Sequence, residues 1–297
     1  MTTTHAPRQW LWEVAVAVAI VAAIAAAAVW TRIYDNGSHF NGSHYNRGHA
    51  NFERGRYREA IANFDQALQL EPDNAGIYVN RGVAKLFLGR YREAIADYDH
   101  ALRLEPDTAY IYTNRAGARS SLGQHREAIA DYDHALRLEP DTTYNYVNRG
   151  VMKSNLGQYR EAIADYDHTL QLEPDNVYAY VSRGRAKSKL GEYDEAFADF
   201  EQAVRLEPDN AYIYTSLGDV KFDLGQIQEA FADYDQAVRL DPDDGYVYFN
   251  RGLAKAEMGL SQEALADLKA ALENARETGA SDFITSIEEK IQELEQE

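Results

Sequence analysis

Residues 75–108 read AGIYVNRGVAKLFLGRYREAIADYDHALRLEPDT, and variants of this 34-residue stretch fill the chain from residue 41 to residue 278. Three framework positions recur at the same step. They are a glycine (Gly55, Gly89, Gly123, Gly157, Gly191, Gly225, Gly259), an alanine (Ala60, Ala94, Ala128, Ala162, Ala196, Ala230, Ala264) and a proline in six copies (Pro72, Pro106, Pro140, Pro174, Pro208, Pro242). Fixed-period repetition predicts a solenoid, in which each unit packs only on its neighbours.

Each copy has the pattern of two helices joined by a turn. Gly89 follows a stretch of helical pattern, where a left-handed residue would end a first helix. Pro106 follows a second helical stretch, where the missing N–H stops the helix. Apolar residues recur at three- and four-residue spacing in the second helix, as in Ala94, Tyr98 and Ala101, and form a face that one hairpin cannot cover. Stacked neighbours must therefore cover it.

The repetition divides the chain into seven units and a tail. The units span residues 41–74, 75–108, 109–142, 143–176, 177–210, 211–244 and 245–278. The last unit lacks the closing proline. Residues 279–297 follow it with an apolar stripe that includes Phe283, Ile287 and Ile291, opposite many glutamates. This pattern predicts a helix that caps the open end of the solenoid.

The framework resembles the tetratricopeptide repeat family. In the second unit the positions that carry the resemblance are Tyr78, Gly82, Ala94, Tyr98, Ala101 and Pro106. The resemblance implies an all-α, right-handed superhelical solenoid of helix-turn-helix repeats whose concave side binds other polypeptides. Separately, we expect a chain with no catalytic activity and no cofactor, for the reasons of motif and composition given below.

Two apolar positions of the family pattern have become basic in this chain. One position holds Arg47, Arg81, Arg115, Arg149, Arg183 and Arg251, and the other holds Lys85, Arg119, Lys153, Lys187, Lys221 and Lys255. An aspartate recurs in the second helix as Asp97, Asp131, Asp165, Asp199, Asp233 and Asp267. We predict a ladder of structural ion pairs between these sets. The alternative is that the arginines bind a partner.

Composition and motifs argue against several functions. The net charge of -18, without a basic patch, disfavours nucleic acid as a partner. The absence of cysteine excludes disulfides and thiolate chemistry. His100, His134 and His168 stand one repeat apart, about 10 Å, which is too far for a shared zinc ion, and we expect them to be exposed on their helices. No phosphate loop, zinc-protease motif or nucleophile elbow is present, so we predict neither catalysis nor a bound metal.

The N-terminal region has the composition of a membrane anchor. Residues 1–10 are polar, and residues 11–30 form an apolar run that spans roughly 30 Å as a helix. We predict a single transmembrane helix there, with a cleaved signal peptide as the alternative. Residues 31–40 contain turn-forming residues and are predicted to form a flexible tether. The distribution of arginine favours repeats on the extracytoplasmic side.

Residues that differ between the repeats are the better candidates for binding. Duplication of a repeat places identical residues at equivalent positions whether or not they have a function. One varied first-helix position holds Val83, Gly117, Val151, Arg185, Asp219 and Leu253, and the position one turn later holds Phe87, Ser121, Asn155, Lys189, Asp223 and Glu257. Their character changes along the chain from apolar to basic to acidic. This change suits the binding of a peptide whose side chains differ in character along its length. The alternative is that the differences between repeats arose by neutral drift.

An asparagine ladder accompanies the varied positions. It holds Asn46, Asn80, Asn114, Asn148 and Asn250, with Ser182 and Ser216 between the last two. A carboxamide can both donate and accept, so it can bind a peptide bond of any sequence. The alternative is a local bond to helix backbone. A tyrosine ladder (Tyr110, Tyr144, Tyr178, Tyr212, Tyr246) is predicted to pack between repeats rather than to contact a ligand.

These observations predict a membrane-tethered interaction scaffold that binds an extended segment of another protein. The predicted groove residues are Asn80, Asn114, Asn148, Val83, Phe87, Asn155, Arg185, Lys189, Asp219, Asp223 and Asn250. The alternative is a structural assembly subunit that acts through oligomerisation or its outer face. The sequence does not identify the partner.

Overall fold

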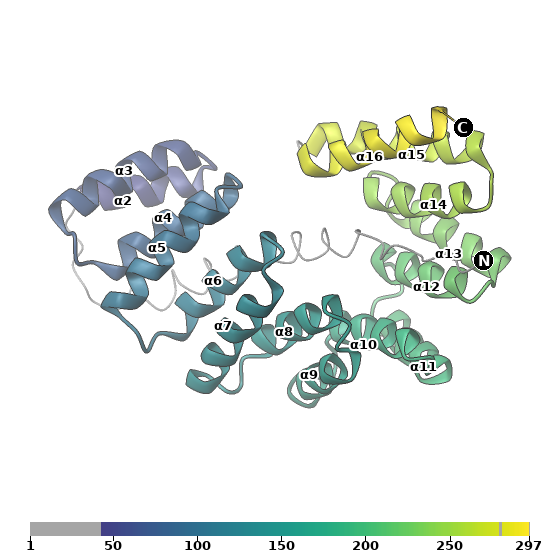
Figure 1. Ribbon diagram of the computed structural model, residues 1–297, viewed down its shortest axis with the longest axis horizontal. Helices are drawn as coiled ribbons and strands as arrows, with labels where there is room; N and C mark the ends of the chain where they lie inside the picture. Colours follow the sequence, from purple (N-terminus) through teal and green to yellow (C-terminus); the bar gives the residue numbers. More distant parts are fainter. Residues whose placement is uncertain (1–42, 279–280, 297) are drawn as a thin grey trace. The chain divides into compact units, whose positions relative to one another are not determined.

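The computed structural model describes residues 43–278 and 281–296 (Figure 1). Within these ranges the chain forms fifteen helices and no strand. The helices are α2 (Ser43–Glu53), α3 (Tyr57–Leu70), α4 (Ala75–Phe87), α5 (Tyr91–Leu104), α6 (Ala109–Ser121), α7 (His125–Leu138), α8 (Thr143–Asn155), α9 (Tyr159–Leu172), α10 (Val177–Lys189), α11 (Tyr193–Leu206), α12 (Ala211–Asp223), α13 (Ile227–Leu240), α14 (Gly245–Glu257), α15 (Ser261–Thr278) and α16 (Ser281–Glu295). The expectation of an all-α repeat protein is confirmed.

The predicted membrane anchor is not part of this description. The polar segment 1–10, the span 11–30 and the tether 31–40 all lie outside the described residues. Among the helices that are described, none combines the length and the apolar character that a membrane crossing needs. The anchor at residues 11–30 therefore stays a prediction from sequence.

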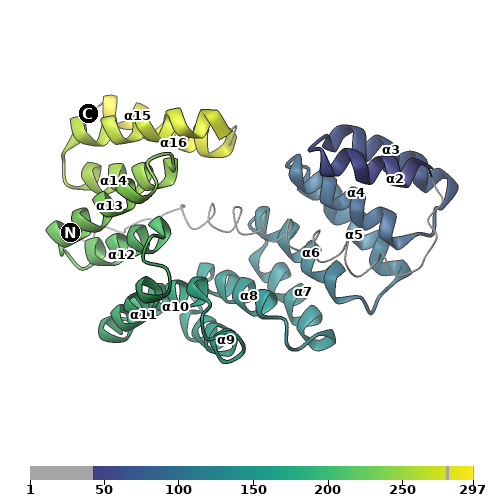
Figure 2. The same ribbon diagram turned by 180° about the vertical axis from the view of Figure 1, so that it is seen from behind.

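The helices pair as hairpins, and the hairpins form two compact units that divide between Leu172 and Glu173. In the first unit α3 packs on α4, α5 on α6 and α7 on α8, so each second helix contacts the first helix of the next repeat. In the second unit α11 contacts α12, α13 contacts α14, and α16 packs on α15. Figure 2 shows the hairpins following one another in sequence order within each unit.

The turn inside each hairpin depends on a left-handed glycine. At Gly89 φ is +69°, and the six equivalent glycines of the other repeats also have positive φ. The Gly89 N–H donates to the Leu86 carbonyl at 2.9 Å, and the Arg90 N–H donates to the Lys85 carbonyl at 2.9 Å. These bonds satisfy carbonyls at the end of α4 that would otherwise lack partners. The glycine position predicted from sequence is confirmed as a helix C-terminus.

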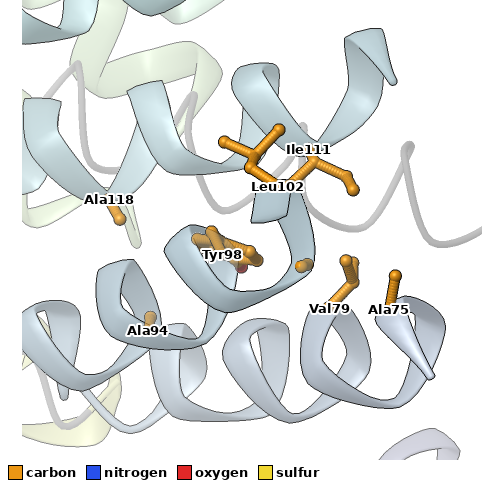
Figure 3. Close-up of a cluster of buried hydrophobic side chains, with 8 residues drawn as sticks. Ala75, Val79, Ala94, Tyr98, Leu102, Ile111 and Ala118 are labelled. Atoms are coloured by element: carbon orange, nitrogen blue, oxygen red, sulfur yellow. The ribbon is translucent and has the colours of Figure 1, made fainter. Parts of the chain in front are cut away.

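The apolar core is shared between successive repeats. In Figure 3 the ring of Tyr98 lies among Val79 of α4, Leu102 of α5 and Ile111 of α6, so three helices from two repeats enclose it. Tyr98 has no exposed surface. Because α6 belongs to the next repeat, the hairpin of α4 and α5 cannot bury this ring alone, and stacking is a condition of folding.

The first and second helices of a repeat approach closely where an aromatic ring meets a glycine. A Cβ atom added to Gly82 would lie 2.7 Å from Cε1 of Tyr98. Gly150 meets Tyr166 and Gly218 meets Tyr234 at the same distance. The missing side chain therefore allows the ring to lie against the helix backbone.

The C-terminal end of the stack is closed by α16. Phe283 and Ile287 of α16 are buried in the cluster that also contains Leu268 of α15. The Phe283 ring also stacks on Tyr246 of α14, with centroids 4.1 Å apart. The apolar stripe of α16 thus covers the last hairpin, as a capping helix would.

We expect Gly82→Ala to destabilise the fold by about 1–3 kcal/mol, because the new methyl group displaces the Tyr98 ring. The matched control is Gly117→Ala in α6, where an added Cβ meets no described atom within 4 Å. That change should stabilise the helix by about 0.5–1 kcal/mol. Urea denaturation followed by circular dichroism measures both. Equal effects of the two substitutions would contradict the packing argument.

Candidate functional site

The recurring aspartate of each second helix is buried and bound by two cations of its own repeat. The Asp97 side chain is 5% exposed. It accepts from Nε of Arg81 at 3.0 Å and from Nζ of Lys85 at 2.7 Å. The same arrangement joins Arg115 and Arg119 to Asp131, Arg149 and Lys153 to Asp165, Arg183 and Lys187 to Asp199, and Arg251 and Lys255 to Asp267. The predicted ion-pair ladder is confirmed.

The ladder also joins successive repeats, which the sequence analysis missed. Nη1 of Arg81 donates to Asp65 of the preceding repeat at 2.6 Å. Equivalent bridges join Arg115 to Asp99, Arg149 to Asp133 and Arg251 to Asp235. The signal was present, because Asp65, Asp99 and Asp133 stand at the 34-residue step. Which arginine they contact depends on how the hairpins stack.

Each ladder arginine contacts an aromatic ring as well as carboxylates. The guanidinium carbon of Arg81 lies 5.4 Å from the ring centroid of Tyr78, and four other repeats have the same pair. Burial by itself would lower the pKa of Arg81, but hydrogen bonds and charge attraction from Asp97 and Asp65 raise that pKa above its ordinary value. Since Nε, Nη1 and Nη2 of Arg81 all donate to carboxylates, this side chain has a structural role.

The ladder is incomplete in the sixth repeat, where Leu217 replaces the arginine. Asp233 keeps the ion pair with Lys221, at 2.6 Å. Burial raises the pKa of the Asp233 carboxyl above its ordinary value, and the bond from Lys221 opposes this shift. With one cation instead of two, less of the cost of burying this carboxylate is offset than in the other repeats.

The histidines His100, His134 and His168 are partly buried, so the expectation that they are exposed was wrong. The His100 ring stacks on Tyr78 with centroids 4.0 Å apart, and Arg103 lies 2.8 Å from its Nδ1. His134 makes the same contacts with Tyr112 and Arg137. Tyrosines of the first helices provide these contacts. In the described ranges, no three acidic or histidine side chains are close enough to hold a metal ion.

The asparagine ladder is not uniform in the first unit. Asn80 of the second repeat donates to the hydroxyl oxygen of Tyr45 in the first repeat at 3.0 Å. Burial raises the pKa of Tyr45 to about 12, while this bond acts in the opposite direction. Asn148 donates to the Tyr144 carbonyl of its own helix at 2.8 Å, which is the local bond that peptide binding would compete with. The partly buried Asn114 amide makes no hydrogen bond to the described residues.

The apolar candidates of the first unit lie near repeat junctions. Phe87 stacks on Tyr57 of the preceding repeat, with centroids 4.7 Å apart. Val83 packs on the cluster around Tyr98 and is partly exposed. Asn155 takes the Phe87 position two repeats later, and its Oδ1 is buried with no hydrogen-bond partner in the described part of the chain. Phe87 thus contributes to packing between repeats, while the equivalent Asn155 has a buried oxygen that no described residue satisfies.

The charged candidates of the second unit contact one another or polar neighbours. Lys189 forms an ion pair with Asp223 of the next repeat at 2.7 Å. Nη1 of Arg185 lies 3.5 Å from Oγ of Ser216, and Asp219 accepts from the Tyr234 hydroxyl at 2.8 Å. Asn250 is partly buried in α14. Pairing between repeats thus accounts for part of the change in charge along the first helices, and peptide binding by these residues stays a prediction.

Members of the tyrosine ladder pack between repeats in the second unit. Tyr178 and Tyr212 of successive repeats lie parallel with centroids 5.9 Å apart. Tyr246 stacks on Phe283 of α16. The packing role predicted for these tyrosines is confirmed.

A stack of helical hairpins with copied aromatic-on-glycine contacts defines the class of α-helical repeat proteins. A TPR repeat model matches residues 48–86, 184–225 and 218–259, and a tetratricopeptide repeat model matches residues 75–108, 109–142, 144–176 and 246–278. Together the matches cover residues 48–278 except for residues 143 and 177–183. The chain belongs to the tetratricopeptide repeat family.

Solved structures of repeat proteins share the fold. A tetratricopeptide repeat protein from Parabacteroides merdae ATCC 43184 is similar with a TM-score of 0.73 and 22% identity, over 82% of this chain and 97% of that chain. MamA from Desulfovibrio magneticus RS-1 is similar with a TM-score of 0.54 and 18% identity, over 56% of this chain and 93% of that chain. Cut9-Hcn1 of the APC/C is similar with a TM-score of 0.62 and 19% identity, over 89% of this chain and 52% of that chain. No curated protein matches the chain.

We expect Asp131→Ala to lower the free energy of unfolding by about 3 kcal/mol, because Arg115 and Arg119 lose the buried carboxylate between them. The control is Asp99→Ala, which removes a carboxylate that is 42% exposed and binds the same Arg115. Its loss should cost less than about 1 kcal/mol. Denaturant midpoints of both variants at low and high salt provide the measurement. A larger effect at Asp99 would reject the buried ladder as a source of stability.

Proposed function

We propose that this chain is an interaction scaffold that binds an extended segment of another polypeptide along its first helices. Repeats of this family generally mediate protein–protein interactions. The finer assignment, to the groove residues from Val83 to Asn250, is the proposal. Residues 11–30 would anchor the scaffold in a membrane with the repeats on the extracytoplasmic side, and the scaffold would catalyse no reaction.

The observation that carries the proposal is the separation of copied and varied residues. Copied residues such as Gly82, Tyr98 and Asp97 are buried in the core or in the ladder. The varied residues lie on first helices, which contact each other from α2 to α4 to α6 in the first unit and from α10 to α12 to α14 in the second. Side chains on adjacent first helices therefore form a continuous face from α2 to α6 in the first unit and from α10 to α14 in the second. A polypeptide on that face would contact residues that differ from repeat to repeat.

The asparagines supply the backbone contacts in this proposal. A carboxamide satisfies both the N–H and the C=O of a peptide bond, so it binds without regard to the side chain. Asn114 is available for this role, because it makes no hydrogen bond to the described residues. Asn80 and Asn148 would exchange the bonds to Tyr45 and Tyr144 for bonds to the ligand, which reduces the net gain from each.

We expect the triple variant Asn80→Ala, Asn114→Ala and Asn148→Ala to lose a specific polypeptide that the parent chain captures from native membranes by crosslinking. Asn114→Ala alone should weaken capture without a change in stability. The matched control is Asn63→Ala, whose amide donates to the Glu59 carbonyl on a second helix. Circular dichroism confirms folding of each variant.

Unchanged capture by a folded triple variant would reject the asparagine contacts. The rival function is an assembly subunit that acts through oligomerisation or the outer face. Light scattering over a range of concentrations separates the two functions, because an assembly subunit increases in mass with concentration while the proposed scaffold keeps one mass.

A further inference from the structure

The first helices of repeats two to four carry no charged side chain outside the ladder. The only charged residues of α4, α6 and α8 are Arg81, Lys85, Arg115, Arg119, Arg149 and Lys153, and each is bound to Asp97, Asp131 or Asp165. In the second unit, α10 and α12 carry further charges at Arg185, Lys189, Asp219 and Asp223. An uncharged face therefore exists in a chain whose net charge is -18.

Gly117 of α6 is at the varied position of this uncharged face and has no packing reason to be glycine. A Cβ atom there would meet no described atom within 4 Å, whereas the framework glycine Gly82 is pressed against a ring. Glycine inside a helix costs about 0.5–1 kcal/mol relative to alanine. The fold therefore gains nothing from Gly117. The open space at Gly117 can accept a side chain of a bound ligand, and a larger residue at this position would fill that space.

The surroundings of Gly117 are apolar on both sides and polar one turn away. Val83 and Val151 hold its position in the neighbouring repeats, and both are partly exposed. Val83 packs on the cluster that contains Ala118, and Val151 packs on the cluster that contains Ala116. Asn114 precedes Gly117 by three residues, so both lie on one side of α6. A hydrogen-bonding amide without a bond to the described residues thus lies on the same side of α6 as an open position, and valines hold the equivalents of that position in the neighbouring repeats.

We propose that the first unit recognises an uncharged, extended segment of another protein, which places a bulky apolar side chain over Gly117 between Val83 and Val151. Asn114 binds the backbone of this segment. The inference rests on the proposed function and adds the class of ligand and the residue that selects it. A charged side chain would lose water on this face without an opposite charge to replace it, since the ladder cations are already bound to carboxylates.

The test is a display library of random dodecapeptides, selected on the full chain, with the selected peptides then measured for binding to variants of it. Gly117→Leu fills the gap, and Asn114→Ala removes the backbone contact. Ala130→Leu is the matched control, because it adds the same bulk at an exposed position on the second helix of the same repeat. We expect peptides selected on the parent chain to be poor in charged residues and to contain a large apolar residue. Gly117→Leu should weaken their binding about tenfold or more, and Ala130→Leu should leave binding unchanged.

The outcomes separate this inference from the proposed function. Selected peptides rich in acidic or basic residues would overturn the inference and leave the scaffold function standing. The same result follows if binding survives in Gly117→Leu but is lost in the triple asparagine variant. Failure to select any peptide on the parent chain would reject both. Gly117→Ala, which is expected to stabilise the helix, supplies a folded variant of intermediate size, and its binding should lie between those of the parent and Gly117→Leu.

Discussion

The ring of Tyr98 against the backbone of Gly82 is the contact on which the other features of the repeat depend. It sets the distance between the first and second helices, and the distance then allows Arg81 and Lys85 of one helix to reach Asp97 of the other. The ring is enclosed only when Ile111 of the next repeat covers it. Packing inside a hairpin and stacking between hairpins are therefore parts of one arrangement, which recurs along each unit with Ala116 in place of the glycine in the third repeat.

The buried ladder shows how the chain carries charge inside a helical stack. A lone buried carboxylate would be costly, but Asp97 and its equivalents each meet two cations of their own repeat. The arginine also reaches back to the preceding repeat at Asp65, so the ladder adds a polar connection to the apolar one. Where Leu217 interrupts the ladder, burial raises the pKa of Asp233. The ladder thus offsets the cost of a buried carboxylate less completely where one of the two cations is missing.

The copied and the varied residues of a repeat have different places in the structure. The copied residues form the core and the ladder, and the varied residues of the first helices are the ones to which we assign the proposed recognition. In the second unit some of these varied residues pair with each other, as Lys189 does with Asp223. In α4, α6 and α8 of the first unit the charged side chains are all bound in the ladder, and Gly117 leaves a gap that internal packing does not use. The two units therefore offer different chemistry to a polypeptide.

The sequence by itself determined the helices, the turns, the repeat period and the ladder partners within a repeat, because these depend on local conformation and on spacing within one copy. The left-handed glycines at Gly89 and its equivalents follow from the same local rule. Only the tertiary structure decided which residues of different repeats meet, as Arg81 does with Asp65 and Lys189 with Asp223, and which ring His100 stacks on inside its own repeat. It also decided that Gly82 is crowded while Gly117 is open. The physical reason is that such contacts depend on how closely neighbouring helices pack, and the periodic pattern of one chain does not specify that distance.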